Sequence, residues 1–404
     1  MSPLVPFGKK FREKYFPNLD KEAYPLNHGS YGLTPKPVHE EYVRTLSKEA
    51  EYPDRYIRYD LPDKYVRALK SVGEFVNCDY RDLALVDNAT TGINTVLRSF
   101  PFEKGDKVLM MSTVYGSCGN TVKFLKEYKG IEYQVVEINY PVQDDEIVGK
   151  IEEIFKTQLV KMCMFDTITS MPGIRFPFEK MVKLCKKYQV LSLVDGAHCI
   201  GLIPFDLGDF KPDFFISNLH KWLFVPRGCA MLYVDTKHHD KVQTLPISHS
   251  YTSDNLVDKF TFIGSKNYAS IACIESAIEF RKGVCGGERA IYEYCLGLSE
   301  QAAKRVKEIW GDVEVLGISG ALVTVEVPMA NPRLFDDATM VKQCEEYVYG
   351  AMIRQYNTYV PMVYHNGKIF ARFSCQIYNE LHEYEYASRV ILEIFDNFFK
   401  SLNK

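Results

Sequence analysis

The chain has 404 residues, a length that favours one large α/β domain with a smaller domain beside it. Its 49 Lys and Arg and 52 Asp and Glu give a net charge of −3. There is no long basic run and no apolar run long enough to span a membrane, which argues against nucleic acid and membranes as partners. The 11 cysteines form no CxxC pair, so we expect reduced thiols in a cytoplasmic protein, with neither a disulfide framework nor a metal site.

Residues 1–62 mix aromatic, charged and proline residues. Prolines at 25, 35, 37, 53 and 62 divide this stretch into short predicted elements. We expect an N-terminal arm that packs across other parts of the protein.

Residues 63–270 alternate apolar, β-branched runs with amphipathic helical stretches. The predicted strands cover residues 83–87, 107–111, 133–138, 160–165, 190–195, 213–217 and 229–234. The predicted helices between them cover residues 91–99, 119–128, 145–157 and 177–188. Such alternation predicts an α/β fold, in which a mostly parallel seven-stranded sheet carries helices on both faces.

The mixture of strand and helix patterns in residues 271–404 predicts a smaller α+β domain. One or two linking helices are expected near 271–310. Further strands are expected at 313–316, 321–327 and 369–374, and helices near 338–354 and 380–400.

Polar residues follow several of the predicted strands of the large sheet, where ligands of parallel sheets bind. Asp195 ends one strand in "VLSLVDGAH", and Lys221 follows the next in "DFFISNLHKW". Asn88, Thr90 and Thr91 stand at a predicted helix N-terminus, which suits a phosphate. A lysine that can form an imine, a carboxylate for a pyridine nitrogen and a phosphate site together indicate pyridoxal phosphate (PLP).

Several longer strings, in a shared order, carry a resemblance to a known family. "VDGAH" (194–198), "SNLHKW" (217–222) and "PRGCAMLYV" (226–234) resemble the class V aminotransferase family, whose members have the PLP-dependent transferase fold, fold type I. Four further strings, at 26–32, 87–94, 165–173 and 371–379, resemble one branch of it. That branch includes isopenicillin N epimerase-like and cysteine desulfhydrase-like proteins and the fungal hercynylcysteine sulfoxide lyases of ergothioneine biosynthesis.

The resemblance implies three catalytic roles. Lys221 would hold PLP as a Schiff base and move the proton at the substrate Cα. Asp195 would pair with the pyridinium nitrogen, and His198 would lie near the ring hydroxyl.

The resemblance also implies contacts to the cofactor and substrate. Tyr115 would stack on the ring, and one of Asp166, Thr169 and Ser170 would contact the ring oxygen. The expected phosphate ligands are Thr90, Thr91, Ser217 and His220. Arg372 would bind the substrate carboxylate, with Asn27 and His28 lining the substrate pocket.

One string departs from the family pattern. Many relatives have a GTxD-like string through which the neighbouring subunit of a homodimer reaches the phosphate. This chain has "FIGSKNYAS" (262–270), in which Ser265 can replace the threonine hydroxyl but the aspartate is missing. We expect a homodimer on family grounds.

Three reactions compete: β-elimination of a sulfur group, epimerisation at Cα, and transamination. Cysteine desulfurases of this superfamily need a nucleophilic cysteine shortly before the carboxylate-binding arginine, and residues 354–372 contain none. We therefore expect a carbon–sulfur β-lyase that acts on L-cysteine or a cysteine S-conjugate or sulfoxide, such as hercynylcysteine sulfoxide. It would release a sulfur product, pyruvate and ammonia; an epimerase or an aminotransferase is the alternative.

Overall fold

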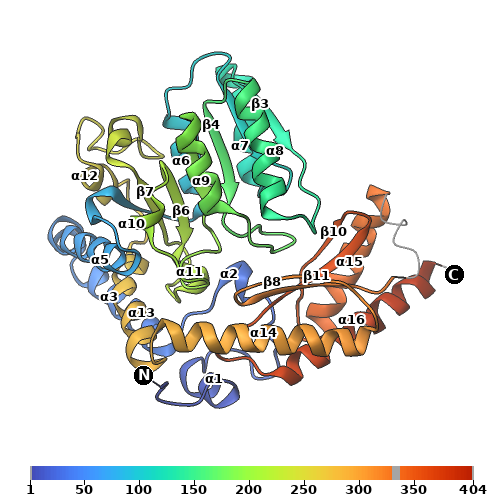
Figure 1. Ribbon diagram of the computed structural model, residues 1–404. Coiled ribbons are helices and arrows are strands. Elements are labelled where there is room, and N and C mark those ends of the chain that lie inside the picture. Colours follow the sequence, from blue (N-terminus) through green and yellow to red (C-terminus); the bar gives the residue numbers. More distant parts are fainter. Residues whose placement is uncertain (1, 330–336, 403–404) are drawn as a thin grey trace.

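The computed structural model describes residues 2–329 and 337–402, which form two sheets with helices around them (Figure 1). The larger sheet has seven strands in the order β1-β7-β6-β5-β4-β2-β3. Its strands are β1 (Leu83–Val86), β2 (Lys107–Met111), β3 (Glu132–Val136), β4 (Met162–Asp166), β5 (Leu191–Asp195), β6 (Phe214–Asn218) and β7 (Ala230–Val234). Only β7 runs against its neighbours, so the prediction of a mostly parallel seven-stranded sheet is confirmed.

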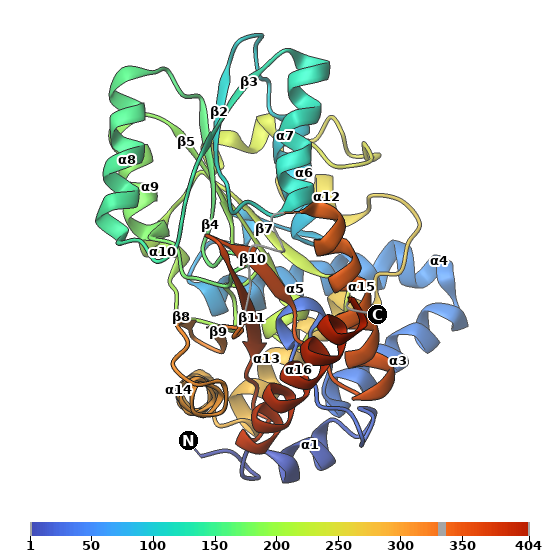
Figure 2. The same ribbon diagram turned by 90° about the vertical axis from the view of Figure 1, so that its right-hand side faces the viewer.

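The strands in the middle of this sheet are apolar along their whole length because both faces are covered. Every residue of β4, β6 and β7 is buried, and so is every residue of the edge strand β1. In Figure 2, α8 (Asp144–Thr157) and α9 (Phe178–Tyr188) lie on one side of the sheet. On the other side lie α6 (Ala89–Ser99) and α7 (Gly116–Lys129).

The N-terminal part contains longer helices than its prolines predict. It forms α1 (Lys9–Tyr15), α2 (His28–Tyr31), α3 (Lys36–Glu51), α4 (Pro53–Arg55) and α5 (Leu61–Val76), and a π-helical turn (Tyr56–Asp60) joins α4 to α5. The prediction of short elements in residues 1–62 is therefore wrong for α3, which has 16 residues; α5, also of 16 residues, only begins there. Pro37 and Pro62 stand in the first turn of these helices, where the missing N–H has no partner to lose.

The C-terminal part is built on a four-stranded antiparallel sheet in the order β10-β11-β9-β8. Its strands are β8 (Val315–Ser319), β9 (Leu322–Glu326), β10 (Met362–His365) and β11 (Lys368–Ser374). The helices of this half are α13 (Ala269–Glu279), α14 (Glu288–Trp310), α15 (Ala338–Gln355) and α16 (Leu381–Leu402). Strand β10 was not predicted, because it is a four-residue edge strand that is only half-buried.

Short helices complete the connections of the large sheet, and α11 carries the predicted lysine. They are α10 (Leu207–Phe210), α11 (Leu219–Trp222) and α12 (Leu256–Thr261). Helix α11 packs against α2 of the N-terminal part (Figure 1). Across the described ranges, no helix is long and apolar enough to cross a membrane. The division into residues 1–62, 63–270 and 271–404 stays a prediction.

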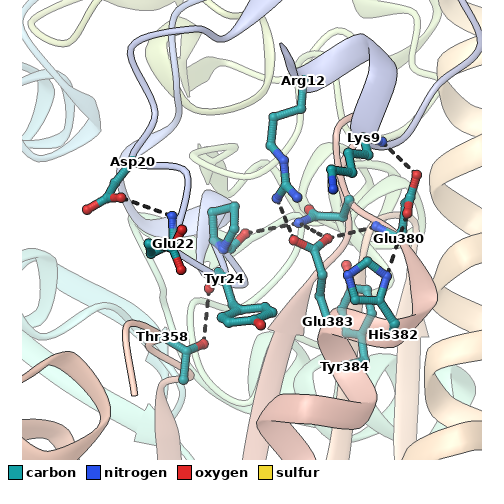
Figure 3. A network of polar contacts seen from close by, with 12 residues as sticks. Lys9, Arg12, Asp20, Glu22, Tyr24, Thr358, Glu380, His382, Glu383 and Tyr384 are labelled. Carbon is teal, nitrogen blue, oxygen red and sulfur yellow. Dashed lines mark hydrogen bonds and ion pairs between the residues drawn. The ribbon is translucent and has the colours of Figure 1, made fainter. Parts of the chain in front are cut away.

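A polar network ties the N-terminal arm to the start of α16 (Figure 3). Arg12 donates to the carboxylate of Glu383 at 2.5 Å, and Glu383 is buried. The carbonyl of Tyr24 accepts a hydrogen bond from Thr358 Oγ1 at 3.0 Å, and the backbone N–H of Lys9 donates to Glu380 at 2.7 Å. The arm is thus held against the C-terminal half both within α1 and after it.

Candidate active site

A cavity of about 510 Å³ opens at the carboxyl ends of β4, β5 and β6. It brings together eleven of the residues singled out from the sequence: Asn88, Thr90, Thr91, Tyr115, Asp166, Ser170, Asp195, His198, His220, Lys221 and Arg372. The arm contributes Gly29, Ser30 and Tyr31 to the same cavity. Residues from distant parts of the chain therefore share one site, at the carboxyl ends of parallel strands where ligands of such sheets bind.

Lys221 lies at the floor of this arrangement, one turn after β6. Its Nζ atom is 3.2 Å from Nε2 of His198. Burial, and after it the positive charge of Arg372, lowers the pKa of Lys221 to about 8. A lysine with this pKa is partly a neutral amine near neutral pH, which is the form that attacks a carbonyl group.

His198 is held in one tautomer by its neighbour Trp222. The indole Nε1–H of Trp222 lies 3.2 Å from Nδ1 of His198, and an indole nitrogen can only donate. Nδ1 therefore accepts, and the ring proton of neutral His198 is on Nε2, which faces Lys221. Burial lowers the pKa of His198 well below its usual range, so the ring is neutral, and its bond to Lys221 requires the neutral amine.

Two buried carboxylates stand side by side at the strand ends. Asp166 ends β4 and Asp195 ends β5, and the two are paired in the register of the sheet. The Asp195 carboxylate accepts from the backbone N–H of Ala197 at 3.0 Å and from the thiol of Cys118 at 3.6 Å. Burial raises the pKa of both carboxyl groups, and the charge of Asp195 raises that of Asp166 further. Within the described ranges neither carboxylate has an ion-pair partner within 4 Å, so a cationic ligand group fits here.

The N-terminus of α6 forms a second, polar end of the cavity. The side-chain oxygen of Asn88 accepts from the N–H of Thr91 at 2.8 Å, and that of Asn218 accepts from the N–H of Ala89 at 2.8 Å. The two bonds fix the first turn, whose hydroxyl groups on Thr90 and Thr91 line the cavity. Hydroxyl groups at the N-terminus of α6, a helix of 11 residues, make a suitable anion site.

His220 lines the cavity beside this helix end. Its Nδ1 atom donates to the carbonyl of Cys229 at 3.0 Å, which leaves Nε2 for a ligand. Burial lowers the pKa of His220 to about 4, so the ring is neutral without a ligand.

Arg372 lies at the opposite end, near the end of β11, and is a buried cation without an anion. Its Nη1 atom donates to the carbonyl of Ser170, and Nη2 lies 3.2 Å from Asn27 Oδ1 and 3.3 Å from Ser30 Oγ. Its Nε has no hydrogen-bond partner although it is buried. Burial lowers the pKa of Arg372 to about 10, and no carboxylate of the described chain is within 4 Å of it. The guanidinium is therefore suited to a carboxylate ligand.

Five of the expected site residues do not line the cavity. Ser217 is buried and ties β6 to the next turn, because its Oγ donates to the carbonyl of Gly196 at 2.6 Å and accepts from the N–H of Ile200 at 3.2 Å. Thr169 is also buried, and its Oγ1 accepts from the N–H of Ile174 at 3.0 Å. Ser265 is exposed outside the cavity.

Asn27 and His28 lie behind the cavity wall. Asn27 reaches Arg372, and His28 contacts the backbone carbonyl of Lys221 at 2.6 Å.

The sequence analysis did not name Asn218, Ser117 or Ser30 as part of the site. Asn218 follows β6 directly, so its place at a strand end was a usable signal. Ser117, whose Oγ is 3.2 Å from Thr90 Oγ1, is brought in only by the packing of α7 on α6. No cluster of three or more possible metal ligands occurs among residues 2–329 and 337–402.

The sheet order and the strand-end lysine, carboxylates and arginine together define an α/β protein with one polar site at its switch edge. The chain belongs to the aminotransferase class-V family, whose sequence profile matches residues 36–386. The resemblance stated from the sequence is confirmed.

Two fungal proteins are similar to this chain over almost their whole length. The "Hercynylcysteine sulfoxide lyase" of Schizosaccharomyces pombe is 30% identical, and the match covers 95% of this chain and 97% of the relative. An "L-cysteine desulfhydrase-like protein" of Epichloe uncinata is 30% identical over 96% of this chain and 95% of the relative. Among solved structures, the cystine C–S lyase C-DES with its product cysteine persulfide aligns with a TM-score of 0.76 at 17% identity. That alignment covers 93% of this chain and 99% of C-DES, and it confirms the fold.

Proposed function

We propose that this chain is a PLP-dependent carbon–sulfur β-lyase that acts on L-cysteine or on a cysteine S-conjugate or sulfoxide. The observation that carries the proposal is the content of one cavity. It joins a lysine of lowered pKa, a buried carboxylate without an ion-pair partner and an arginine without an anion, and no cysteine lines it. The lyase and desulfhydrase-like relatives support the choice of reaction.

The polar groups of the cavity fit PLP at each end. Lys221 would bind the aldehyde carbon, Asp195 the protonated ring nitrogen, and His198 with Asp166 or Ser170 the ring oxygen. Thr90, Thr91 and His220 would bind the phosphate, and Tyr115 would cover the ring. When bound, PLP supplies an electron-poor ring that takes up the electron pair released at the substrate Cα.

The chain's own residues would then bind the substrate and move its protons. Arg372 would bind the α-carboxylate with two parallel N–H groups, which fixes Cα near Lys221. The neutral amine of Lys221 would take the Cα proton, the Cβ–S bond would break, and the sulfur would leave with its electron pair. Tyr31 and Tyr115 line the cavity, and one of these phenol groups would protonate the sulfur. The released 2-aminoacrylate hydrolyses to pyruvate and ammonia.

A protein-bound persulfide is not part of this proposal. Cys118 contacts Asp195 but is buried and does not line the cavity, and burial together with that carboxylate raises the pKa of its thiol. A thiol with a raised pKa is a poor nucleophile. Residues 354–372, where a desulfurase cysteine is expected, contain none.

Three finer assignments belong to the same proposal. The fungal lyase relative supports hercynylcysteine sulfoxide, and so ergothioneine biosynthesis, as the substrate and pathway. Eleven free cysteines, all buried except Cys78, support a cytoplasmic location. The family membership supports a homodimer.

Pyruvate release by the purified, PLP-loaded protein tests the reaction. The panel would contain L-cysteine and matched cysteine S-conjugates with their sulfoxides, and Lys221→Ala is the control. We expect pyruvate from the native chain and none above background from Lys221→Ala, and the rate ranking identifies the leaving group. A cofactor spectrum that changes with each amino acid while no pyruvate forms would overturn the proposal in favour of epimerisation or transamination.

A further inference from the structure

His28 of the N-terminal arm lies directly behind Lys221 and is almost fully buried. Its Nε2 atom is 2.6 Å from the backbone carbonyl oxygen of Lys221, and its Nδ1 atom is 2.7 Å from the hydroxyl of Tyr378. Its ring packs against Trp222, the next residue after the lysine, with centroids 5.0 Å apart. His28 does not line the candidate-site cavity and lies on the backbone side of the lysine.

The direction of both hydrogen bonds follows from the partners. A backbone carbonyl can only accept, so Nε2 of His28 carries the proton and donates to Lys221. Burial lowers the pKa of His28 to about 3, so the ring is neutral and Nδ1 accepts from the Tyr378 hydroxyl. The chain from Tyr378 through His28 to Lys221 therefore has a single arrangement of its protons.

The segment that carries His28 is fixed on both sides. The N–H of Gly29 donates to Ser374 Oγ at 3.1 Å, and the N–H of Ser374 donates to the carbonyl of Leu26 at 2.8 Å. On the other side Gly32 lies so close to the lysine loop that a Cβ there would be 1.8 Å from the carbonyl oxygen of His220. Earlier in the chain, Arg12 anchors the arm to the start of α16 through the network of Figure 3.

We propose that His28, oriented by Tyr378, is a positioning residue for Lys221. It holds the backbone carbonyl of the lysine, and thereby the point from which the side chain reaches His198 and the substrate Cα. Because Tyr378 follows β11, which carries Arg372, the same contact sets the lysine relative to the carboxylate-binding arginine. This role rests on the proposed function of Lys221 as the group that moves the Cα proton.

The test compares His28→Gln and Tyr378→Phe with Tyr294→Phe. The control removes a hydroxyl that donates to the backbone carbonyl of Asn379, one residue from Tyr378, and that reaches neither His28 nor Lys221. Two readouts are independent of the sulfur substrate. They are the visible circular dichroism of the lysine-bound cofactor and the exchange of the Cα proton of L-alanine, which lacks a leaving group, with deuterium from solvent.

We expect His28→Gln to slow Cα exchange by about tenfold or more, since displacements below 1 Å are costly in proton transfer, and to weaken the dichroic band. Tyr378→Phe keeps the ring packing and should slow exchange by about threefold or more, with the KM for L-alanine changed less than about twofold. Tyr294→Phe should match the native chain.

Native dichroism and native exchange rates in a folded, cofactor-loaded Tyr378→Phe would overturn the proposal even if His28→Gln failed to fold. An absence of pyruvate from every sulfur substrate, with exchange slowed as expected, would overturn the β-lyase assignment and leave the role of His28 standing.

Discussion

Two histidines contact Lys221, one at its side-chain amine and one at its backbone carbonyl. An aromatic residue next to each histidine fixes that histidine in one tautomer. Trp222 orients His198 toward Nζ, and Tyr378 orients His28 toward the backbone carbonyl. Around this lysine the cavity holds two groups, Asp195 and Arg372, that have hydrogen bonds but no ion-pair partner within the described ranges. Burying such groups is unfavourable unless a ligand pairs with them, so their placement indicates where the two charges of a bound cofactor and amino acid belong.

The pKa of Lys221, lowered by burial and then by the charge of Arg372, makes the reactivity of this lysine dependent on pH in a testable way. With a pKa of about 8, the neutral fraction of Lys221 rises about tenfold per pH unit below that value and levels off above it. We expect the rate of PLP uptake by the apoprotein to follow this curve. In Arg372→Gln the neighbouring positive charge is lost, so the pKa of Lys221 rises and the midpoint moves to higher pH.

Stopped-flow absorbance between about pH 6 and pH 10 measures these midpoints. Arg175→Gln is the control, since Arg175 pairs with Glu179 at 2.5 Å and does not act on Lys221. Equal midpoints in Arg372→Gln and the native chain would contradict the assignment of the shift to Arg372.

Among the elements, the strands of the large sheet were predictable and the arm was not. A strand buried on both faces is apolar throughout, so β4, β6 and β7 are visible as short runs in the sequence. Strand β10 is half-buried on the edge and gives no such signal. In α3 and α5 the prolines mark helix starts, yet a proline in a polar stretch reads equally well as a break.

The site residues that directly follow a buried strand were predictable from the sequence. Asp195, Lys221 and Thr90 follow buried runs directly, and the structure places them in one cavity. The positions of His28 and Ser217 depend on which atoms of other elements lie next to them. His28 meets the back of the lysine loop and Ser217 meets the carbonyl of Gly196, and neither contact leaves a pattern in the sequence.

The close approach of α2 to α11 predicts a strong effect of one methyl group. Gly32 has φ +65°, and a Cβ there would lie 1.8 Å from the carbonyl oxygen of His220. Gly32→Ala adds this clash to the strain of a positive φ, and we expect it to lower the free energy of unfolding by about 3 kcal/mol or more. It should also release PLP, because the lysine loop must shift.

Gly228→Ala is the matched control for this substitution. Gly228 has φ +89° and open space at the Cβ position, so only the strain of about 1 kcal/mol remains. Denaturant unfolding followed by circular dichroism compares the two variants. Equal losses of unfolding free energy in the two variants would show that α2 and α11 can move apart at no energetic cost, which would contradict the prediction.

At the scale of the whole molecule, the arm joins the two halves. It contacts the lysine loop of the large sheet through His28 and Gly32, and the C-terminal half through Arg12 and Tyr24 (Figure 3). The cavity lies where the halves meet, with Lys221 from one and Arg372 from the other. The distance between cofactor and substrate carboxylate is thus fixed by how these parts pack.

The expected homodimer gives Ser265 a role that its own chain does not use. Ser265 is exposed and outside the cavity, while Lys266 beside it pairs with Asp87 just before α6. In the proposed homodimer we expect its hydroxyl to donate to the phosphate bound by a second copy. Loss of one hydrogen bond to a charged group should weaken PLP binding about tenfold in Ser265→Ala. Ser47→Ala, which removes an exposed hydroxyl on α3, should leave the affinity unchanged.

Light scattering coupled to size exclusion should give twice the 46.5 kDa of one chain, and fluorescence titration of the apoprotein gives the affinities for PLP. A monomer that binds PLP with native affinity in Ser265→Ala would show that each chain completes its own phosphate site. In that case the hydroxyls of Thr90 and Thr91 and the imidazole of His220 would be sufficient, and the missing aspartate of the GTxD-like string would mark a lost contact between subunits.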